Sequence, residues 1–315
     1  MNLSHAYDVP PPPEVARKLL PRALELGVTQ FDTAALYGFG ANEELVGDVL
    51  SPHRARITLV SKGGMNGDTG RRVIDGRPAA IIAGCEQSLR RLRADVIDLY
   101  YLHRWDKRVP IEESMGAMAE LVRTGKVRTL GLSEVSAQTL RRAHAVHPIA
   151  AVQSEYSLWT RNPEIGVLEA CRELGARFVA FSPIARGWLS GKLRDVDHFV
   201  AKDLRRAMPR FQAPYFEANR PLLDEHVVIA QELGCTPAQL ALAWVLAREP
   251  DIIPLTGTRS IEHLEENLEA DTLRLSASTV ARLDELFEPS RIAGHRYSLE
   301  TQLEIDTEDF STGSG

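Results

Sequence analysis

The chain has 315 residues, of which 44% are hydrophobic and 25% charged, and its formal net charge is −6. This composition is typical of a globular protein with a sizeable core, and the scattered lysines and arginines argue against a nucleic-acid-binding surface. The longest apolar runs, such as residues 241–247, are too short to span a bilayer, and residues 1–13 do not resemble a signal peptide. We therefore expect a cytoplasmic protein without a membrane partner.

Short apolar segments rich in β-branched residues alternate with longer segments of helical periodicity. Because these short segments are nearly all apolar, they are typical of strands buried on both faces. The predicted strands are Thr29–Thr33, Ile57–Ser61, Ile97–Leu102, Val127–Ser133, Ala150–Ser154, Phe178–Ser182 and Ile252–Leu255.

Helices are predicted between the strands, where apolar residues recur three and four positions apart. The prolines at 10–13 suit the first turn of a helix. The clearest apolar stripes run from Ile81 to Leu92, from Met115 to Val122 and from Leu168 to Leu174, and a last helix is expected from Ala277 to Phe287.

Alternation of strand and helix implies a parallel sheet with right-handed crossovers. Seven or eight such units favour a single α/β domain, a (β/α)₈ TIM barrel over residues 1–315, rather than a doubly wound sheet, since no GxGxxG motif follows a strand. An eighth strand could only be the stub Asn2–Ser4, so we expect a truncated first strand. We also expect a lid-like insertion at about 187–219 and an irregular tail from about 289.

The three cysteines, Cys85, Cys171 and Cys235, are far apart in the sequence and form no CxxC motif. Cys85 and Cys171 fall on the apolar stripes of predicted helices. We interpret them as small buried hydrophobic residues in a reducing compartment, and we expect no metal site.

Titratable residues follow three consecutive predicted strands, at the face where barrels carry their active sites. Asp32 and Tyr37 follow the first of these strands, Lys62 the second and His103 the third. A tyrosine can protonate a carbonyl reduced by hydride if its pKa falls from about 10 toward neutrality, which a nearby ammonium favours. A buried ammonium needs a carboxylate, and a histidine can bind the carbonyl oxygen or relay the proton. Each residue alone has an ordinary explanation, so the prediction depends on their joint placement.

Seven further motifs stand in order along the chain: GVTQFDTAALYGFGANEELVG from Gly27, ITLVSKGG from Ile57, IDLYYLHRWD from Ile97, GLSEVSAQTL from Gly131, VQSEYSLWTR from Val152, FSPIARGWLSGKL from Phe181 and IIPLTGTRSIEHLEENLEA from Ile252. They resemble those of the aldo-keto reductase family, in the family's order, and the resemblance runs from about Met1 to Tyr297. Within the family, the chain looks like the branch of aryl-alcohol dehydrogenases and perakine reductase. The resemblance implies that Asp32, Tyr37, Lys62 and His103 are catalytic, and that an aldehyde or ketone is reduced with NADPH.

The resemblance also implies a cofactor site without a Rossmann fold. Ser133 and Gln153 would hold the nicotinamide carboxamide, and Phe181 would stack on the nicotinamide ring. A following loop would lie beside the pyrophosphate, where glycine lets backbone N–H groups come close to a phosphate. The residues of that loop are Ser182, Ile184, Gly187, Leu189, Gly191 and Lys192.

The segment Gly257–Thr258–Arg259 opens a predicted helix after the last strand. A helix N-terminus and an arginine both favour an anion, which we expect to be the 2′-phosphate of NADPH. The alternative is an ordinary surface helix capped by Ser or Thr. Further along this helix, Glu266 and Asn267 resemble the adenine contacts. His263 is also expected in the cofactor site, although it stands where some family members have Arg.

The chain departs from the family pattern at two places. Glu134 stands where many members have Asn, and its carboxylate could accept a hydrogen bond from the carboxamide or form a salt bridge. The family's first strand usually ends in a phrase such as MNLSHAYG, and this chain begins with MNLSHAYD. We therefore expect the natural protein to start upstream; the alternative is a variant whose barrel tolerates a stub.

Aromatic residues near the barrel mouth are expected to line a pocket for an apolar or aromatic carbonyl substrate, although each could instead serve packing. They are Trp105, Trp159, Trp188, Tyr215, Phe216 and Tyr297. The alternative function is a cofactor-binding regulatory subunit resembling potassium-channel β-subunits, but no channel-facing surface is marked in the sequence. The substrate, the direction of the reaction and the oligomeric state stay open.

Overall fold

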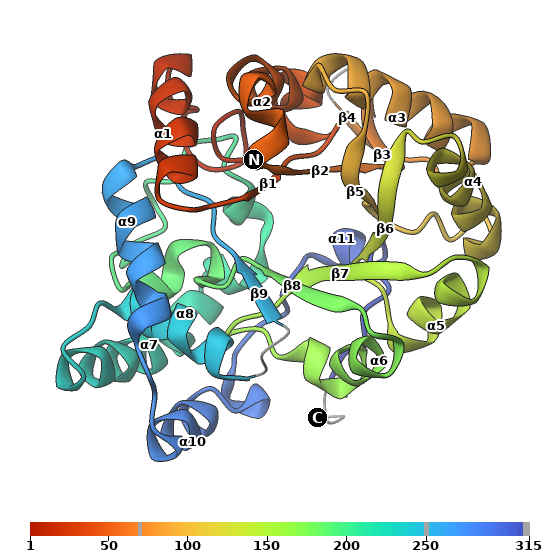
Figure 1. Cartoon of the computed structure of the whole chain (residues 1–315). Coiled ribbons are helices and arrows are strands. Elements are labelled where there is room, and N and C mark those ends of the chain that lie inside the picture. Colours follow the sequence, from red (N-terminus) through yellow and green to blue (C-terminus); the bar gives the residue numbers. More distant parts are fainter. Residues whose placement is uncertain (69–70, 249–251, 311–315) are drawn as a thin grey trace.

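A computed structural model of the chain describes residues 1–68, 71–248 and 252–310. Seven parallel strands form one curled sheet in the order β1-β2-β5-β6-β7-β8-β9, and helices surround it (Figure 1). All seven predicted strand segments are confirmed, with ends that differ by two residues at most. The strands are β1 (Gln30–Asp32), β2 (Thr58–Gly63), β5 (Ile97–Leu102), β6 (Val127–Ser133), β7 (Ile149–Glu155), β8 (Arg177–Phe181) and β9 (Ile252–Leu255).

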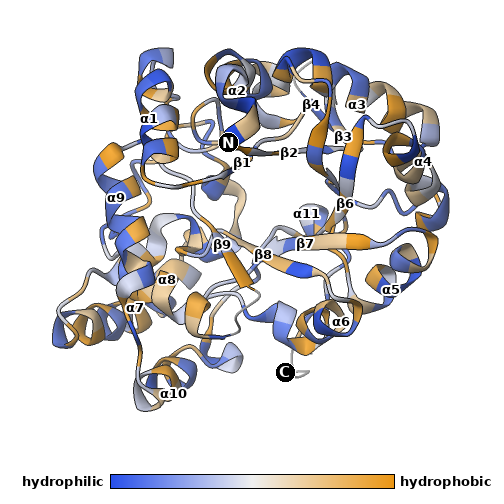
Figure 2. Cartoon of the chain, in the orientation of Figure 1, coloured by the Kyte–Doolittle hydropathy of each residue, from blue (hydrophilic) through white to orange (hydrophobic). Residues whose placement is uncertain are grey.

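The helices return the chain between the strands and cover the outside of the sheet. Hydrophobic and hydrophilic residues alternate along these helices (Figure 2), and the buried residues of α3 and α4 include Ile81, Cys85, Met115 and Met118. The predicted helices are confirmed, and Pro13 is the first residue of α1. The described helices are α1 (Pro13–Glu25), α2 (Ala41–Leu50), α3 (Pro78–Leu92), α4 (Ile111–Arg123), α5 (Ala137–Val146), α6 (Val167–Leu174), α7 (Tyr215–Glu232), α8 (Pro237–Arg248), α9 (Ile261–Glu269), α10 (Ala277–Leu286) and α11 (Leu299–Gln302).

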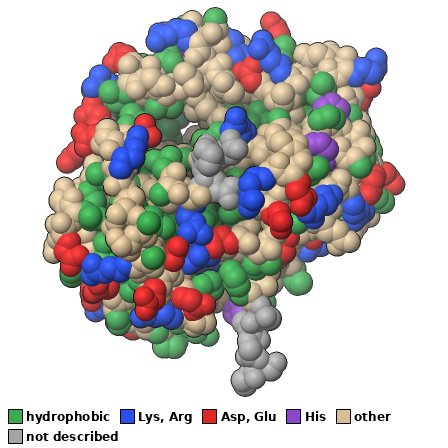
Figure 3. Space-filling model, turned by 60° about the horizontal axis from the view of Figure 1, so that its bottom comes forward, with side chains coloured by type: hydrophobic (Ala, Val, Ile, Leu, Met, Phe, Trp, Pro, Cys, Tyr) green, Lys and Arg blue, Asp and Glu red, His purple; other side chains and the backbone are tan. Residues whose placement is uncertain are grey.

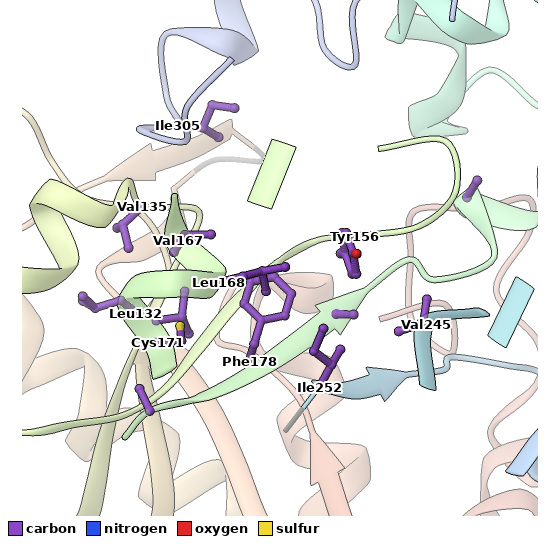
Figure 4. Packing of buried hydrophobic residues seen from close by; sticks show 14 of the residues in the cluster. Leu132, Val135, Tyr156, Val167, Leu168, Cys171, Phe178, Val245, Ile252 and Ile305 are labelled. Carbon is purple, nitrogen blue, oxygen red and sulfur yellow. The ribbon is translucent and has the colours of Figure 1, made fainter. Parts of the chain in front are cut away.

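The hydrophobic core lies between the sheet and these helices. Cys171 of α6 is buried with Leu132 of β6 and Phe178 of β8 in one cluster (Figure 4). Cys85 is fully buried in the same core. Burial raises the pKa of both thiols to about 12, so the interpretation of these cysteines as small buried hydrophobic residues is confirmed.

The expected eighth strand at Asn2–Ser4 is wrong. The backbone N–H groups of Ser4 and His5 donate to the carbonyl oxygen of Met1, at 3.0 and 3.1 Å, so this segment is a turn. It pairs with no strand, and β1 and β9 form the two edges of the described sheet. The N-terminal residues 1–9 contact both sides of that opening, since Ser4 accepts a hydrogen bond from Asn42 at 2.8 Å and the Val9 carbonyl oxygen accepts one from Arg259 at 3.0 Å.

Two further features differ from the expectations. An antiparallel hairpin of β3 (Met65–Asp68) and β4 (Arg71–Ile74) follows β2 and is not among the predicted elements. The expected insertion at 187–219 ends earlier, because α7 begins at Tyr215; residues 187–214 contain only short 3₁₀ turns and irregular chain.

None of the described helices is long and apolar enough to cross a membrane. Basic and acidic side chains are interspersed on the face in Figure 3 and do not gather into areas of one sign. The parallel register matters most for function, because it brings the carboxyl ends of all seven strands to one edge of the sheet.

Candidate active site

The predicted catalytic residues meet at this carboxyl edge. Asp32 ends β1, Lys62 lies near the end of β2, His103 directly follows β5, and Tyr37 begins a short 3₁₀ turn after β1. Lys62 forms a buried ion pair with Asp32. Its Nζ also donates to the Thr33 carbonyl oxygen at 2.9 Å and to the Tyr37 hydroxyl at 3.4 Å. The lysine thus connects the carboxylate with the phenol.

The charge of Lys62 is held in place by its partners. Burial alone would lower the pKa of this lysine, but the charge of Asp32 and the contact with Tyr37 outweigh it, and the pKa is raised. Gln153 of β7 donates from Nε2 to the second oxygen of Asp32 at 2.9 Å. Asp32 is therefore held from two sides, which fixes the orientation of the ion pair.

Tyr37 and His103 lie beside each other, with ring centroids 5.9 Å apart and planes at 83°. Burial raises the pKa of Tyr37 although the Lys62 charge pulls it down, so the expected fall toward neutrality is wrong for the protein alone. Burial, followed by the charges of Arg104 and Lys62, holds the pKa of His103 well below its usual value. The site therefore holds a neutral phenol and a neutral imidazole.

The residues expected around a nicotinamide lie on the neighbouring strands. Ser133 of β6 and Gln153 of β7 are paired in register, and Phe181 ends β8 next in the sheet. Arg104 donates to the Ser133 hydroxyl at 3.1 Å and to the His103 carbonyl oxygen at 2.7 Å. These contacts join the β6–β8 side of the edge to the catalytic residues.

The loop after β8 contains the residues expected beside a pyrophosphate. Gly187 and Gly191 have φ values of 92° and 74°, which favour glycine. The side chain of Leu189 is fully buried in the core, and its N–H donates to the Ile184 carbonyl oxygen at 3.3 Å, as the Gly187 N–H does at 3.0 Å. The role of Leu189 beside a pyrophosphate stays a prediction. Ser182, Ile184, Gly187, Leu189, Gly191 and Lys192 all lie between the end of β8 and the irregular segment.

The helix after β9 has a serine N-cap, as expected for the alternative of an ordinary surface helix capped by Ser or Thr. Ser260 accepts a hydrogen bond from the His263 N–H at 3.3 Å, and Thr258 accepts one from Ser260 at 3.0 Å. Arg259 donates to Val9 and lies 3.5 Å from the Asp8 carboxylate. The expected adenine-side and phosphate-side residues lie along this segment: Gly257, Thr258 and Arg259 before α9, and His263, Glu266 and Asn267 on it.

Two basic groups from separate segments meet beside this helix. Lys192 Nζ lies 3.4 Å from His263 Nε2, and within the described ranges no carboxylate is within ion-pair distance of Lys192. The Lys192 ammonium donates to the His263 ring, and its charge is available for a group of negative charge between the β8 loop and α9.

Glu134 forms a salt bridge and does not face an open site. Arg296 of the tail binds it through both terminal nitrogens, at 3.1 and 2.6 Å, and the Glu155 N–H donates to it at 2.8 Å. Arg186 pairs with Glu155 at 2.6 Å and donates to Tyr297 at 3.1 Å. The salt bridge is one of the two roles that the sequence left open for Glu134. Its partner Arg296 and the pairing of Glu155 with Arg186 were not predicted, although Glu155 stands at a strand end as the other candidates do.

The aromatic residues expected in a substrate pocket divide into two groups. Trp188 and Phe216 are buried, and Trp188 stacks on Trp159 with ring centroids 4.0 Å apart, so these side chains serve packing. Tyr215 is 41% exposed. The other two residues make polar contacts: Trp105 Nε1 donates to the Val109 carbonyl oxygen at 2.9 Å, and the Tyr297 hydroxyl accepts a hydrogen bond from Arg186.

Comparisons with known proteins agree with one another. The model of the aldo/keto reductase family matches residues 1–288. "Aldo-keto reductase yakc [NADP(+)]" of Schizosaccharomyces pombe is 42% identical over 93% of this chain and 88% of its own length. "Probable aldo-keto reductase 1" of Glycine max is 41% identical over 94% of this chain and 86% of its own.

Solved structures give the same result. The glycerol dehydrogenase AKR11B4 of Gluconobacter oxydans superposes with a TM-score of 0.82 at 29% identity, covering 93% of this chain and 91% of its own. An aldo/keto reductase of Klebsiella pneumoniae in complex with NADP and acetate has a TM-score of 0.70 at 30% identity, with coverages of 91% and 89%. Sequence and architecture thus lead to the same family over nearly the whole chain.

Proposed function

The chain belongs to the aldo/keto reductase family, and from this premise we propose that it reduces an aldehyde or ketone to an alcohol with NADPH, with Tyr37 as the proton donor. The observation that carries this proposal is the buried Lys62 ammonium, which contacts both the Asp32 carboxylate and the Tyr37 hydroxyl. A relative is named for NADP(+), and another binds NADP in its solved structure.

In this proposal, each catalytic residue has a separate task. Tyr37 holds its proton for the carbonyl oxygen, and its raised pKa keeps it protonated at neutral pH. Lys62 stabilises the phenolate left after the proton has moved, and Asp32 keeps Lys62 charged and oriented. His103, as a neutral imidazole beside Tyr37, donates a hydrogen bond to the same carbonyl oxygen.

The residues also fit the proposed cofactor. Lys192 and His263 bring two nitrogens together without a carboxylate partner for the lysine within the described part of the chain, and Gly187 and Gly191 let backbone N–H groups approach phosphate. Ser133 and Gln153 would orient the carboxamide, and NADPH supplies the hydride when bound. Arg259, half-exposed beside the same helix, would pair with the 2′-phosphate.

We propose the finer architecture on the same basis. The seven strands of the sheet correspond to seven of the eight strands in the family's (β/α)₈ barrel. The N-terminal turn lies between β1 and β9, where the barrel would have its remaining strand. Residues 1–315 form one domain, in which residues 187–214 act as a lid over the cofactor.

The test is a spectrophotometric screen that follows NADPH absorbance with aliphatic and aromatic aldehydes and ketones. We expect saturable turnover of at least one of them. Tight NADPH binding with no turnover of any carbonyl compound would contradict a reductase and favour the regulatory-subunit alternative. The parallel reaction with NADH measures the preference for the 2′-phosphate.

A further inference from the structure

A cavity of about 220 Å³ lies outside the catalytic cluster. It is open to solvent on one side and is lined by the loop after β7, the segment that leads into α7, and the C-terminal tail. None of the four predicted catalytic residues lines it, and of the aromatic residues predicted for a substrate pocket only Trp159 and Tyr215 do. Trp159, Tyr215 and Phe310 give the cavity an apolar side.

Arg210 contributes a cation to this cavity and has no anionic partner. Its Nε donates to Gly294 at 3.0 Å, and its Nη1 donates to the Thr160 hydroxyl at 3.1 Å and to the Trp159 carbonyl oxygen. All three acceptors are neutral. Within residues 1–68, 71–248 and 252–310, no carboxylate lies within ion-pair distance of this guanidinium, and its Nη2 makes no hydrogen bond. Burial accordingly lowers the pKa of Arg210 to about 10.

The other two arginines of the cavity differ from Arg210 in this respect. Arg161 pairs with Glu164 at 2.7 Å, and Arg296 pairs with Glu134 at 2.6 Å. A buried charge is costly unless it is paired. Arg210 has no ion pair among the described residues, and the more distant charges of Glu155 and Asp309 offset only part of the effect of burial on its pKa. Its guanidinium also lies 5.4 Å from the centroid of the Trp159 ring, which holds it against the apolar wall.

One acidic residue, Asp309, also lines the cavity. It accepts a hydrogen bond from the Asn162 amide at 3.0 Å and forms no ion pair with Arg210. A bound anion would be repelled by this carboxylate and attracted by Arg210. Removal of the Asp309 charge should therefore strengthen the binding of an anion, whereas removal of the Arg210 charge should weaken it.

We propose that this cavity is a binding site for a small organic acid, whose carboxylate pairs with Arg210 and whose apolar body lies against Trp159, Tyr215 and Phe310. A guanidinium presents a planar pair of N–H donors that matches a carboxylate. A dry cavity of about 150 Å³ holds benzene, so the volume here suits an acid with one ring or a short chain. The proposal is independent of carbonyl reduction.

Benzoate is the probe, and benzamide is the matched neutral control. The full chain is titrated with each by calorimetry, and its melting temperature is measured with and without ligand. We expect benzoate to bind saturably and to raise the melting temperature, and benzamide to bind at least tenfold more weakly. Equal binding of the two, or no binding of benzoate, contradicts the proposal.

Variants then locate the site. Arg210→Met removes the charge-assisted contact and weakens benzoate binding by about ten- to hundredfold. Arg210→Lys keeps the charge and retains part of the affinity. Asp309→Asn tightens binding by up to about fivefold, because a like charge is removed. Ile292→Phe, which narrows the cavity and keeps Arg210, weakens binding as well. The melting temperature of each unliganded variant shows whether it is folded.

The catalytic cluster is the competing location for benzoate. Tyr37→Phe is expected to leave benzoate binding unchanged. Loss of binding in Tyr37→Phe together with full binding in Arg210→Met would place the ligand at the catalytic residues and overturn the proposal. Equal affinity for inorganic phosphate and benzoate would contradict the role of the apolar wall.

Discussion

Replacement of Lys62 by methionine tests the electrostatic coupling at the centre of the site. At the observed 3.4 Å between Lys62 Nζ and the Tyr37 oxygen, Coulomb's law with an effective dielectric constant of about 20 gives an attraction to the phenolate of roughly 5 kcal/mol. Loss of that attraction raises the pKa of Tyr37 further, by up to about 3.5 units. Since only part of this charge has developed when the proton moves, we expect kcat for carbonyl reduction to fall by about 10²–10³-fold.

The same substitution leaves the buried Asp32 carboxylate without its cation, which costs about 3–5 kcal/mol of folding free energy. Asp32→Asn/Lys62→Met removes both charges and should recover most of the stability in a thermal or urea unfolding experiment, but none of the activity. The assay follows NADPH absorbance, with cofactor binding measured separately by fluorescence. Activity near the parent level in either variant would refute the proposed role of Lys62.

Three further predictions address the cofactor, the tail and the core. Arg259→Ala should weaken NADPH binding by about ten- to hundredfold and NADH binding much less, which fluorescence titration would show; equal losses would place Arg259 outside the 2′-phosphate site. Arg296→Met should lower the melting temperature by leaving Glu134 buried without its cation, and Glu134→Gln/Arg296→Met should recover part of it; an unchanged melting temperature in Arg296→Met would contradict the pairing. Because burial raises the pKa of Cys85 and Cys171 to about 12, iodoacetamide at pH 8 should label them only after unfolding; rapid labelling of the native protein would contradict this prediction.

Glu134 also affects how the free energy of unfolding changes at acidic pH. The charges of Arg296 and Arg104, against the opposing effect of burial, lower the pKa of this carboxyl from 4.5. Its contribution is therefore fully present above pH 4.5 and is lost as the pH falls through the lowered value. We expect the Glu134→Gln variant to lose less stability than the parent when the pH is reduced from 5 to 3, as measured by urea unfolding.

The strands and the meeting of the candidate catalytic residues at one sheet edge could be predicted from the sequence because both depend on local signals. A buried parallel strand is a short apolar run, and the residue that ends it lies at a known edge of the sheet. This is why Asp32, Lys62 and His103 could be placed together before their contacts were known. Lys62 carried the most information, since a lysine is rarely placed where it must be buried.

The features that were not predicted depend on contacts between distant parts of the chain. The partner of Glu134 is Arg296, 162 positions away, and no local pattern connects them. The pKa of Tyr37 was expected to fall because only the lysine could be inferred; its degree of burial, which acts in the opposite direction, is a property of the folded chain. Trp188 is fully buried and stacks on Trp159, and aromatic composition alone cannot distinguish such a packed ring from one that lines a pocket.

The turn at Asn2–Ser4 and the β3–β4 hairpin were missed for related reasons. A three-residue stub has no periodicity that separates strand from turn, and its geometry follows from hydrogen bonds to Met1. The β3–β4 hairpin could have been predicted, because turn-forming residues interrupt the sequence after β2.

The most direct test of the account is the single-turnover rate of carbonyl reduction in Tyr37→Phe, with NADPH bound. The substitution keeps the ring and removes only the hydroxyl that contacts Lys62. We predict a loss of about 10²–10⁴-fold with unchanged NADPH affinity, whereas Tyr100→Phe, at a buried tyrosine of β5, keeps the parent rate. A Tyr37→Phe rate equal to that of the parent would show that the proton comes from another group and would contradict the proposed mechanism.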